Sequence, residues 1–367
     1  MVAEETFAYE STDTPFDPVS SERPNVLLIT LDTVRADRLG PYGYERAHTP
    51  HLNALAEEAV LFEHCCASVP VTLPSHATII TGLEPYEHGV RNNGIHAIAP
   101  DITTLAERRA ARVSELGADW IHRHRRSPWF AWLHHFDPHD PYDPPAPYDR
   151  MCADPYDGEI AYTDAHLGGL FRELHRQGLW DATLIIVTAD HGEETHSLFV
   201  YHTTIHVPLL IKPAATGAWR DQDLGGRRCR DLVATTDIYP TILDLAGLSD
   251  AAAESAGPGG EAPRSLAHSL GPVLDGHAHA RSWAYLESLV PEFDYGWSPY
   301  RAVIHDGWKY IDAPRPELYD LTRDPGERRN LIVTDAPDAA HADAAHAKRA
   351  EGGAGRCEGH EVGARSL

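Results

Sequence analysis

Two short segments of the chain combine an apolar run of the buried-strand type with metal-ligating side chains at its end. The run NVLLITL is followed by Asp32, and the run TLIIVTA is followed by Asp190 and His191. Carboxylate plus imidazole suits zinc or manganese, while an oxygen-rich set would suit calcium or magnesium. A strand-end aspartate can instead cap a following helix. Because Asp137 and His139 follow a third apolar run, we interpret these strand ends as a metal site.

A hydroxyl group lies between these segments, at Thr72 in the sequence TLPSH. Threonine is a common helix N-cap, so Thr72 has a purely structural interpretation as well. A helix N-terminus also favours oxyanions, and a metal bound to the hydroxyl would lower its pKa and make it nucleophilic at neutral pH. Together with Asp32 and Asp190, Thr72 predicts a metal-activated hydroxyl that attacks a small anionic ester.

These groups require a sheet whose strands end at a common edge. The apolar runs predict buried strands at residues 25–31, 129–136, 183–189 and 207–212. The spacing of apolar residues predicts helices at residues 51–62, 72–82 and 158–180, and a further helix capped by Thr236. This alternation predicts an α/β fold with a mostly parallel central sheet flanked by helices, whose ligands bind at the carboxyl ends of the strands.

The composition and the pattern of apolar residues change after residue 248. Short strand-like runs at residues 283–321, with Asp306 and Gly307 as a hairpin turn, predict a small antiparallel C-terminal subdomain. The predicted organisation is a disordered segment at 1–22, a catalytic α/β domain at 23–248, a linker at 249–263, the subdomain at 264–333 and a disordered tail at 334–367.

Composition excludes several classes of protein. The 367 residues are 42% apolar and 23% charged, as in globular proteins. A net charge of −24 argues against nucleic-acid binding, so an anionic substrate needs local attraction from metal ions. The five cysteines show no CxxC spacing, which argues against a thiolate zinc site. We expect no membrane segment, and the first twenty residues lack a secretion signal, which predicts a cytoplasmic location for the chain as written.

Several segments, in order, resemble the sulfatase branch of the alkaline phosphatase superfamily. They are PNVLLITLDTVRADRLGPYGY, TLPSHATIITGLEPYEHGVRNNG, FDPHDPY, VTADHGEE, TDIYPTILDLAG and GWSPYRAVIHDGWKYIDAPRPELYDLTRDPGERRNL. The resemblance implies an alkaline phosphatase-like α/β core with a C-terminal subdomain and a divalent metal. It also implies hydrolysis of a sulfate or phosphate ester through a covalent intermediate, in a family whose members are often exported.

The resemblance also implies roles for individual residues. Asp32, Asp190 and His191 match ligands of a first metal, and Thr72 matches the nucleophile. His76 stands in place of the arginine of the sulfatase signature, and Asn92 or Asn93 would hold the oxygens of the substrate. Asp137 and His139 match residues at a second metal or the substrate. His196 and His206 are further candidates. Arg91 either clamps the anion or supports its loop.

Two departures from the family pattern bear on the chemistry. Sulfatases make formylglycine from cysteine or serine, and Thr72 cannot be converted in that way, so a phosphoester is chemically favoured over a sulfate ester. Thr33 replaces the second aspartate of the usual pair, which favours zinc or manganese over calcium. A transferase is a subsidiary alternative, although such enzymes usually need a membrane anchor.

The chain between Glu107 and Trp129 is shorter than in relatives, where another sheet strand is expected, and the loop after Glu193 also looks shortened. Buried backbone groups left without partners cost about 1–3 kcal/mol each, against a domain stability of about 5–15 kcal/mol. The alternative hypothesis is therefore an internally deleted, inactive sulfatase-like protein that at most binds metal. The sequence specifies neither the alcohol of the ester nor the oligomeric state.

Overall fold

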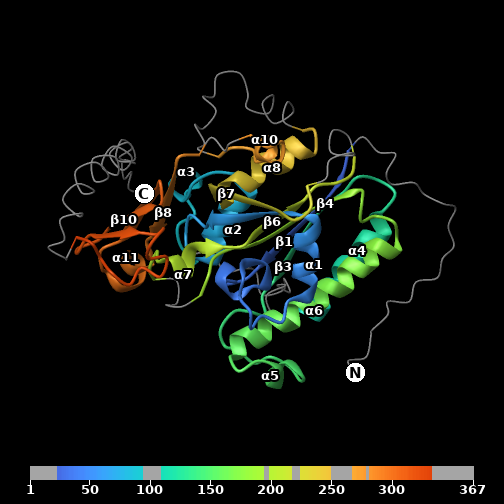
Figure 1. Cartoon of the computed structure of the whole chain (residues 1–367), viewed down its shortest axis with the longest axis horizontal. Coiled ribbons are helices and arrows are strands. Elements are labelled where there is room, and N and C mark those ends of the chain that lie inside the picture. Colours follow the sequence, from blue (N-terminus) through green and yellow to red (C-terminus); the bar gives the residue numbers. More distant parts are fainter. Residues whose placement is uncertain are drawn as a thin grey trace, which may run out of the picture.

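The structure contains a seven-stranded sheet covered by helices and a separate four-stranded antiparallel sheet. This computed structural model describes residues 23–93, 109–193, 198–216, 224–248, 267–277 and 281–332. Figure 1 shows the smaller sheet, which includes β8 and β10, to the left of the larger one. The predicted α/β class with a small antiparallel C-terminal sheet is thereby confirmed.

The larger sheet is mixed but has a dominant direction. Its strands are β1 (Asn25–Leu31), β2 (Val60–Cys66), β3 (Phe130–His135), β4 (Thr183–Ala189), β5 (His206–Val207), β6 (Leu209–Lys212) and β7 (Arg227–Ala234). The order is β3-β1-β4-β6-β2-β5, with β7 also paired to β2. β5 and β6 run antiparallel to their neighbours, and the other ladders are parallel. The remaining five of the seven strands therefore share one direction, as the predicted mostly parallel sheet requires.

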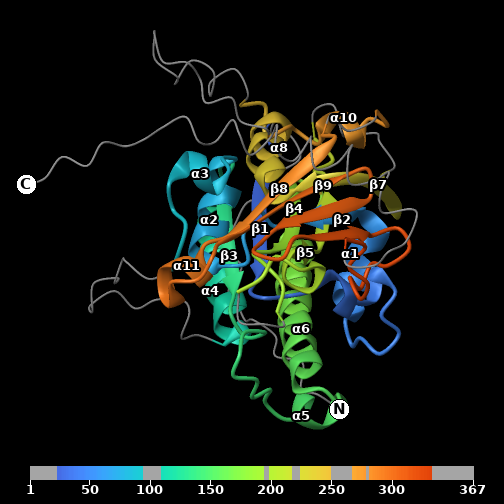
Figure 2. The same cartoon turned by 90° about the vertical axis from the view of Figure 1, so that its left-hand side faces the viewer.

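Helices pack on both sides of this sheet. They are α1 (Pro50–Glu58), α2 (Thr72–Thr81), α3 (Pro85–His88), α4 (Ala110–His124), α5 (Tyr148–Met151), α6 (Pro155–Arg176), α7 (His202–Ile205), α8 (Ile238–Leu245), α10 (Gly271–Leu274) and α11 (Val290–Tyr295). α6 packs against α1 and α4, whereas α8 packs against α2 and α10. Figures 1 and 2 show α6 below the sheet and α8 above it. None of the helices in the described part of the chain combines the length and apolar character needed to cross a bilayer.

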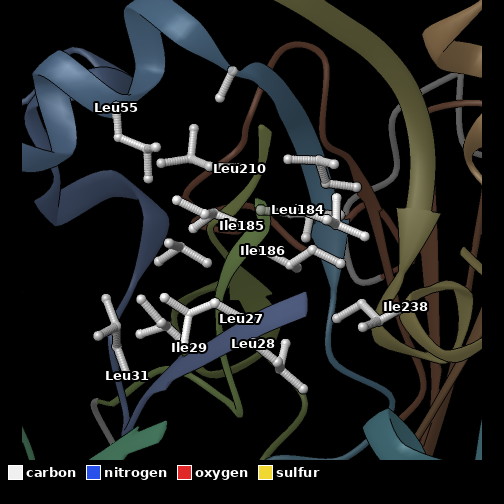
Figure 3. Close-up of a cluster of buried hydrophobic side chains, with 14 of the residues drawn as sticks. Leu27, Leu28, Ile29, Leu31, Leu55, Leu184, Ile185, Ile186, Leu210 and Ile238 are labelled. Carbon is white, nitrogen blue, oxygen red and sulfur yellow. The ribbon is translucent and has the colours of Figure 1, made fainter. Parts of the chain in front are cut away.

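The core fixes the strands that end at the candidate site. Every residue of β1 and β4 is buried, and Figure 3 shows their Leu and Ile side chains within one apolar cluster. Successive side chains of a strand point to opposite faces, so Leu27 and Leu28 pack into different layers. A one-residue slip would exchange these faces, and the packing therefore sets the register that places the residues after β1 and β4.

Three local predictions were wrong in detail. The helix predicted at 51–62 ends at Glu58, because Val60 to Phe62 pair with neighbouring strands and Phe62 is completely buried. The strand predicted at 207–212 is split at Pro208, which has no N–H to donate to a ladder. Thr236 does not cap α8; it lies in a 3-10 turn and its hydroxyl accepts a hydrogen bond from Arg281. β7 was not predicted.

The smaller sheet follows the predicted antiparallel pattern. Its strands are β8 (Trp283–Ser288), β9 (Tyr300–His305), β10 (Trp308–Asp312) and β11 (Glu317–Asp320). Asp306 and Gly307 join β9 to β10 with positive φ angles of 48° and 77°, as a tight hairpin with a primed turn requires. The predicted domain boundaries stay predictions, and the segments 1–22, 249–263 and 334–367 lie outside the described residues.

A buried ion pair links the start of α8 to the segment before β8. Arg281 donates to both carboxylate oxygens of Asp237, at 3.0 and 2.6 Å, and both side chains are almost fully buried. We expect Arg281→Ala to lower the free energy of unfolding by about 3–5 kcal/mol, because it leaves a buried carboxylate without its cation. Arg112→Ala, which removes an exposed ion pair with Glu115, should cost at most about 1 kcal/mol. Urea denaturation measures both, and equal losses would contradict this account.

Candidate metal and nucleophile site

Asp32 and Asp190 lie side by side where two neighbouring strands end. Leu31 and Ala189 are register partners at the ends of β1 and β4, so the next residue of each strand reaches the same edge. Both carboxylates are completely buried. The backbone N–H of Thr33 donates to Asp190 Oδ1 at 3.0 Å, which ties the two strand ends together. The structure thus brings together the two carboxylates that the sequence analysis selected.

His191 is held with one ring nitrogen facing these carboxylates. Its Nδ1 lies 2.9 Å from the carbonyl oxygen of Gly192. A carbonyl only accepts, so Nδ1 carries the hydrogen and Nε2 has a free lone pair when the ring is neutral. Nε2 lies 3.6 Å from Asp190 Oδ2 and 3.3 Å from Thr72 Oγ1. A Cβ on Gly192 would come within 2.2 Å of the Thr203 carbonyl oxygen, so this turn requires glycine.

Thr72 is the first residue of α2, and Val71 occupies the N-cap position. The Thr72 hydroxyl contacts His191 Nε2, and Asn93 supplies a cap by accepting from the backbone N–H of Leu73 at 2.8 Å. The buried Ser75 hydroxyl donates to the Asp190 carbonyl oxygen at 2.6 Å and fixes α2 against the end of β4. The N-cap interpretation of Thr72 is therefore wrong, and the nucleophile interpretation stays a prediction.

Two further histidines adjoin the carboxylates. His76, one helical turn after Thr72, places Nε2 3.9 Å from Asp190 Oδ2. His134 of β3 places Nε2 3.2 Å from Asp32 Oδ2. His134 was not predicted as a ligand, although two histidines interrupt the apolar run FAWLHHF. Its neighbour His135 is buried beside Ser114 of α4 instead, as the alternation of side chains along a strand requires.

The charges of these groups are strongly coupled. Burial and the neighbouring charge of Asp190 raise the pKa of Asp32 well above its usual value. Burial also acts to raise the pKa of Asp190, but His191, His76 and His134 outweigh it and lower that pKa. Burial lowers the pKa of His76 to about 4. A divalent cation suits this donor set, because it would compensate two buried carboxylates that otherwise disfavour each other's charge.

The predicted second-site residues Asp137 and His139 belong to neither group of clustered ligand atoms in the described part of the chain. The backbone of Ala110 at the start of α4 favours the ionised form of the Asp137 carboxylate, but burial outweighs it and raises the pKa to about 6. The His139 ring stacks on Phe136, and its Nδ1 lies 2.6 Å from the carbonyl oxygen of Asp140. His139 still favours the ionised form of Asp32 through its charge.

His206 also lies elsewhere, in a cluster of histidines. Its Nε2 lies 2.8 Å from the carbonyl oxygen of Glu63, and its ring stacks on His202 with centroids 4.3 Å apart. Burial lowers the pKa of His206 to about 4, so the ring is neutral at physiological pH. His196 lies outside the described residues.

Arg91 and Asn92 connect the loop after α3 to the C-terminal part of the chain. Arg91 forms a two-pronged ion pair with Glu287 of β8, with Nε donating at 2.8 Å. Asn92 Nδ2 donates to Asp294 Oδ1 of α11 at 3.1 Å. These contacts support the loop-supporting alternative for Arg91 over the anion clamp.

Family models and curated proteins show which families this chain is similar to. Residues 107–248 match the family model described as Sulfatase, and residues 26–123 match Type I phosphodiesterase / nucleotide pyrophosphatase. Arylsulfatase K of Mus musculus is 30% identical over 210 residues, which cover 52% of this chain and 32% of that protein. Delta 4,5-hexuronate-2-O-sulfatase of Bacteroides thetaiotaomicron is 21% identical over 422 residues, with 85% of each chain covered. The chain thus spans about a third of the length of Arylsulfatase K.

Solved structures show the same fold. The phosphonate monoester hydrolase of Agrobacterium radiobacter superposes with a TM-score of 0.69 at 22% identity, over 91% of this chain and 96% of that one. The mixed sheet flanked by helices, together with the smaller antiparallel sheet, defines an alkaline phosphatase-like fold. Within that class, the family-model matches and the curated relatives make the chain similar to the sulfatase family of the alkaline phosphatase superfamily.

Proposed function

We propose that this protein is a metal-dependent hydrolase that cleaves a phosphoric or sulfuric ester with Thr72 as the nucleophile. The observation that carries the proposal is the Thr72 hydroxyl, which belongs to the first residue of a helix and lies 3.3 Å from His191 Nε2. The same ring nitrogen lies 3.6 Å from the buried carboxylate of Asp190. The names of related proteins, which include sulfatases and a phosphonate monoester hydrolase, support the same reaction type.

Each of these residues has its own role in the proposed reaction. Asp32, Asp190 and His191 would hold the divalent cation, which when bound lowers the pKa of the Thr72 hydroxyl and stabilises the charge that develops on the ester. Thr72 Oγ1 forms a bond to phosphorus or sulfur while the bond to the leaving alcohol breaks. Water then breaks the bond between Thr72 Oγ1 and phosphorus or sulfur, which releases the remaining acid or its monoester and returns a proton to the Thr72 hydroxyl. The helix N-terminus favours the anionic group throughout.

Two observations favour a phosphoester and a zinc or manganese ion. Thr72 cannot become formylglycine, so the nucleophile in this chain is the hydroxyl itself. Thr33 does not act as a ligand, since its hydroxyl donates to the Pro138 carbonyl oxygen at 2.8 Å. The cluster instead contains imidazoles, which suit zinc and manganese better than calcium or magnesium.

Turnover of matched aryl esters tests the proposal. With zinc or manganese added to metal-stripped protein, we expect p-nitrophenyl phosphate or bis(p-nitrophenyl) phosphate to give a higher kcat/KM than p-nitrophenyl sulfate. Protein held in chelator is the control, and its rate should fall to background. A higher kcat/KM for the sulfate would contradict the phosphoester preference. Bound metal without turnover of any ester would support the inactive alternative instead.

A further inference from the structure

His76 and His134 approach the Asp190 carboxylate from two different elements, α2 and β3. Their rings meet edge to face with centroids 4.5 Å apart. The ligand atoms of His76, His134 and Asp190 all lie within 4.8 Å of one another, as do those of Asp32, Asp190 and His191. We propose that Asp190 bridges two divalent cations, one held with Asp32 and His191 and the other by His76 and His134. This inference rests on the proposed metal-dependent function.

Unpaired polar atoms at both sets of ligands indicate bound positive charge. Within the described residues, Asp32 Oδ1, Asp190 Oδ2 and His76 Nε2 are buried without a hydrogen-bond partner. A buried polar atom left unsatisfied costs about 1–3 kcal/mol. The three atoms belong to neighbouring side chains, and all of them can donate a lone pair to a cation. Two cations that share Asp190 would satisfy all three.

His134 is held in the orientation of a metal-binding histidine. Its Nδ1 lies 2.9 Å from Thr30 Oγ1, on the residue paired with it across β1 and β3. The same hydroxyl accepts from Trp132 Nε1 at 2.9 Å, and the Trp132 ring also packs against His76. Metal-binding histidines usually place the second ring nitrogen against an oxygen in this way. Nε2 of His134 is thereby left to face the carboxylates.

The geometry favours two ions over one ion with many ligands. Donors on opposite sides of a single zinc ion lie roughly 4 Å apart. The two ligand sets share only Asp190 and together offer five side chains, which is more than the four ligands that a tetrahedral zinc ion binds. Ions of two-metal sites lie about 3.5–4 Å apart and stabilise both the attacking and the leaving oxygen of an ester. His76 follows Thr72 by one helical turn, so the second ion would lie on the same helix face as the nucleophile.

Metal stoichiometry tests this inference. Metal-stripped protein would be dialysed against buffered Zn²⁺, and zinc bound per chain would be measured by elemental analysis. We expect two ions in the wild type, one in His134→Ala and in His76→Gln, and close to none in Asp190→Ala. The matched control is His124→Ala, at an exposed position of α4, which should keep both ions. A single ion in the wild type, or two ions in both histidine variants, would overturn the proposal.

The number of ions bound per chain is interpreted independently of folding and of activity. Thermal melting monitored by circular dichroism shows which variants are folded. If His134→Ala does not fold, His76→Gln decides, because the His76 side chain is 20% exposed. Turnover does not enter the measurement. An inactive chain that binds two ions would contradict the proposed function and support the second metal site. An active chain that binds one ion would support the proposed function and contradict the second metal site.

Discussion

Thr72→Ala should lower kcat for ester hydrolysis by at least about 10³-fold, because loss of a covalent nucleophile removes most of the catalytic effect of the groups arranged around it. The Thr72 hydroxyl lies 3.3 Å from His191 Nε2, while the helix cap is supplied by Asn93. The variant should therefore fold and keep its metal. Steady-state kinetics at saturating metal, with zinc content measured on the same sample, checks both statements.

Two variants control for indirect effects on α2. Thr72→Ser keeps a hydroxyl and should retain far more activity than Thr72→Ala. Thr81→Ala removes a hydroxyl at the other end of the same helix, where it donates to the Ala77 carbonyl oxygen, and should leave kcat close to the wild-type value. Turnover in Thr72→Ala near the wild-type rate would exclude Thr72 as the nucleophile.

Asp190→Asn should abolish most of the thermal stabilisation that zinc gives to the protein. A metal that binds only the folded state stabilises it by about 2.7 kcal/mol at 100 times its Kd, and 1 kcal/mol shifts Tm by roughly 1–2 °C in a chain of this size. Asp190 belongs to both ligand sets, so its loss should remove nearly the whole shift. Differential scanning fluorimetry with and without zinc measures it.

The isosteric asparagine preserves the shape of the side chain and one acceptor oxygen, where Asp190 Oδ1 accepts from the backbone N–H groups of Thr33 and His191. Asp181→Asn, at an exposed position before β4, is the matched control and should keep the full zinc-induced shift. If Asp190→Asn gained as much in Tm from zinc as the wild type does, the ligand assignment would be wrong.

The sequence predicted the positions of Asp32 and Asp190 well, because both follow long apolar runs whose ends are sharp. Parallel pairing of β1 and β4 then brings the two residues together, a consequence of sheet geometry that requires no knowledge of the loops. The hairpin at Asp306 and Gly307 was predictable for a similar reason, since a positive φ at both positions is a local property of the turn.

Other features depended on contacts that a linear pattern does not contain. The face of β3 that His134 occupies is fixed by its pairing with β1. Asp137 follows the same strand, but its carboxylate contacts the backbone of α4, whose position the sequence does not reveal. The helix predicted at 51–62 failed because pairing with β6 and β7 stabilises Val60 to Phe62 as a strand, which overrides the helical spacing of apolar residues.

Mass spectrometry of acid-quenched protein tests most directly whether Thr72 carries the covalent intermediate. Zinc-loaded protein would be mixed with bis(p-nitrophenyl) phosphate, quenched in acid within the first turnovers and digested. We expect a phosphoryl ester adduct on the peptide that contains Thr72, with fragment ions assigning it to that residue. Turnover accompanied by an adduct on a different residue, or by none at any quench time while a phospho-threonine standard survives the work-up, would contradict the account.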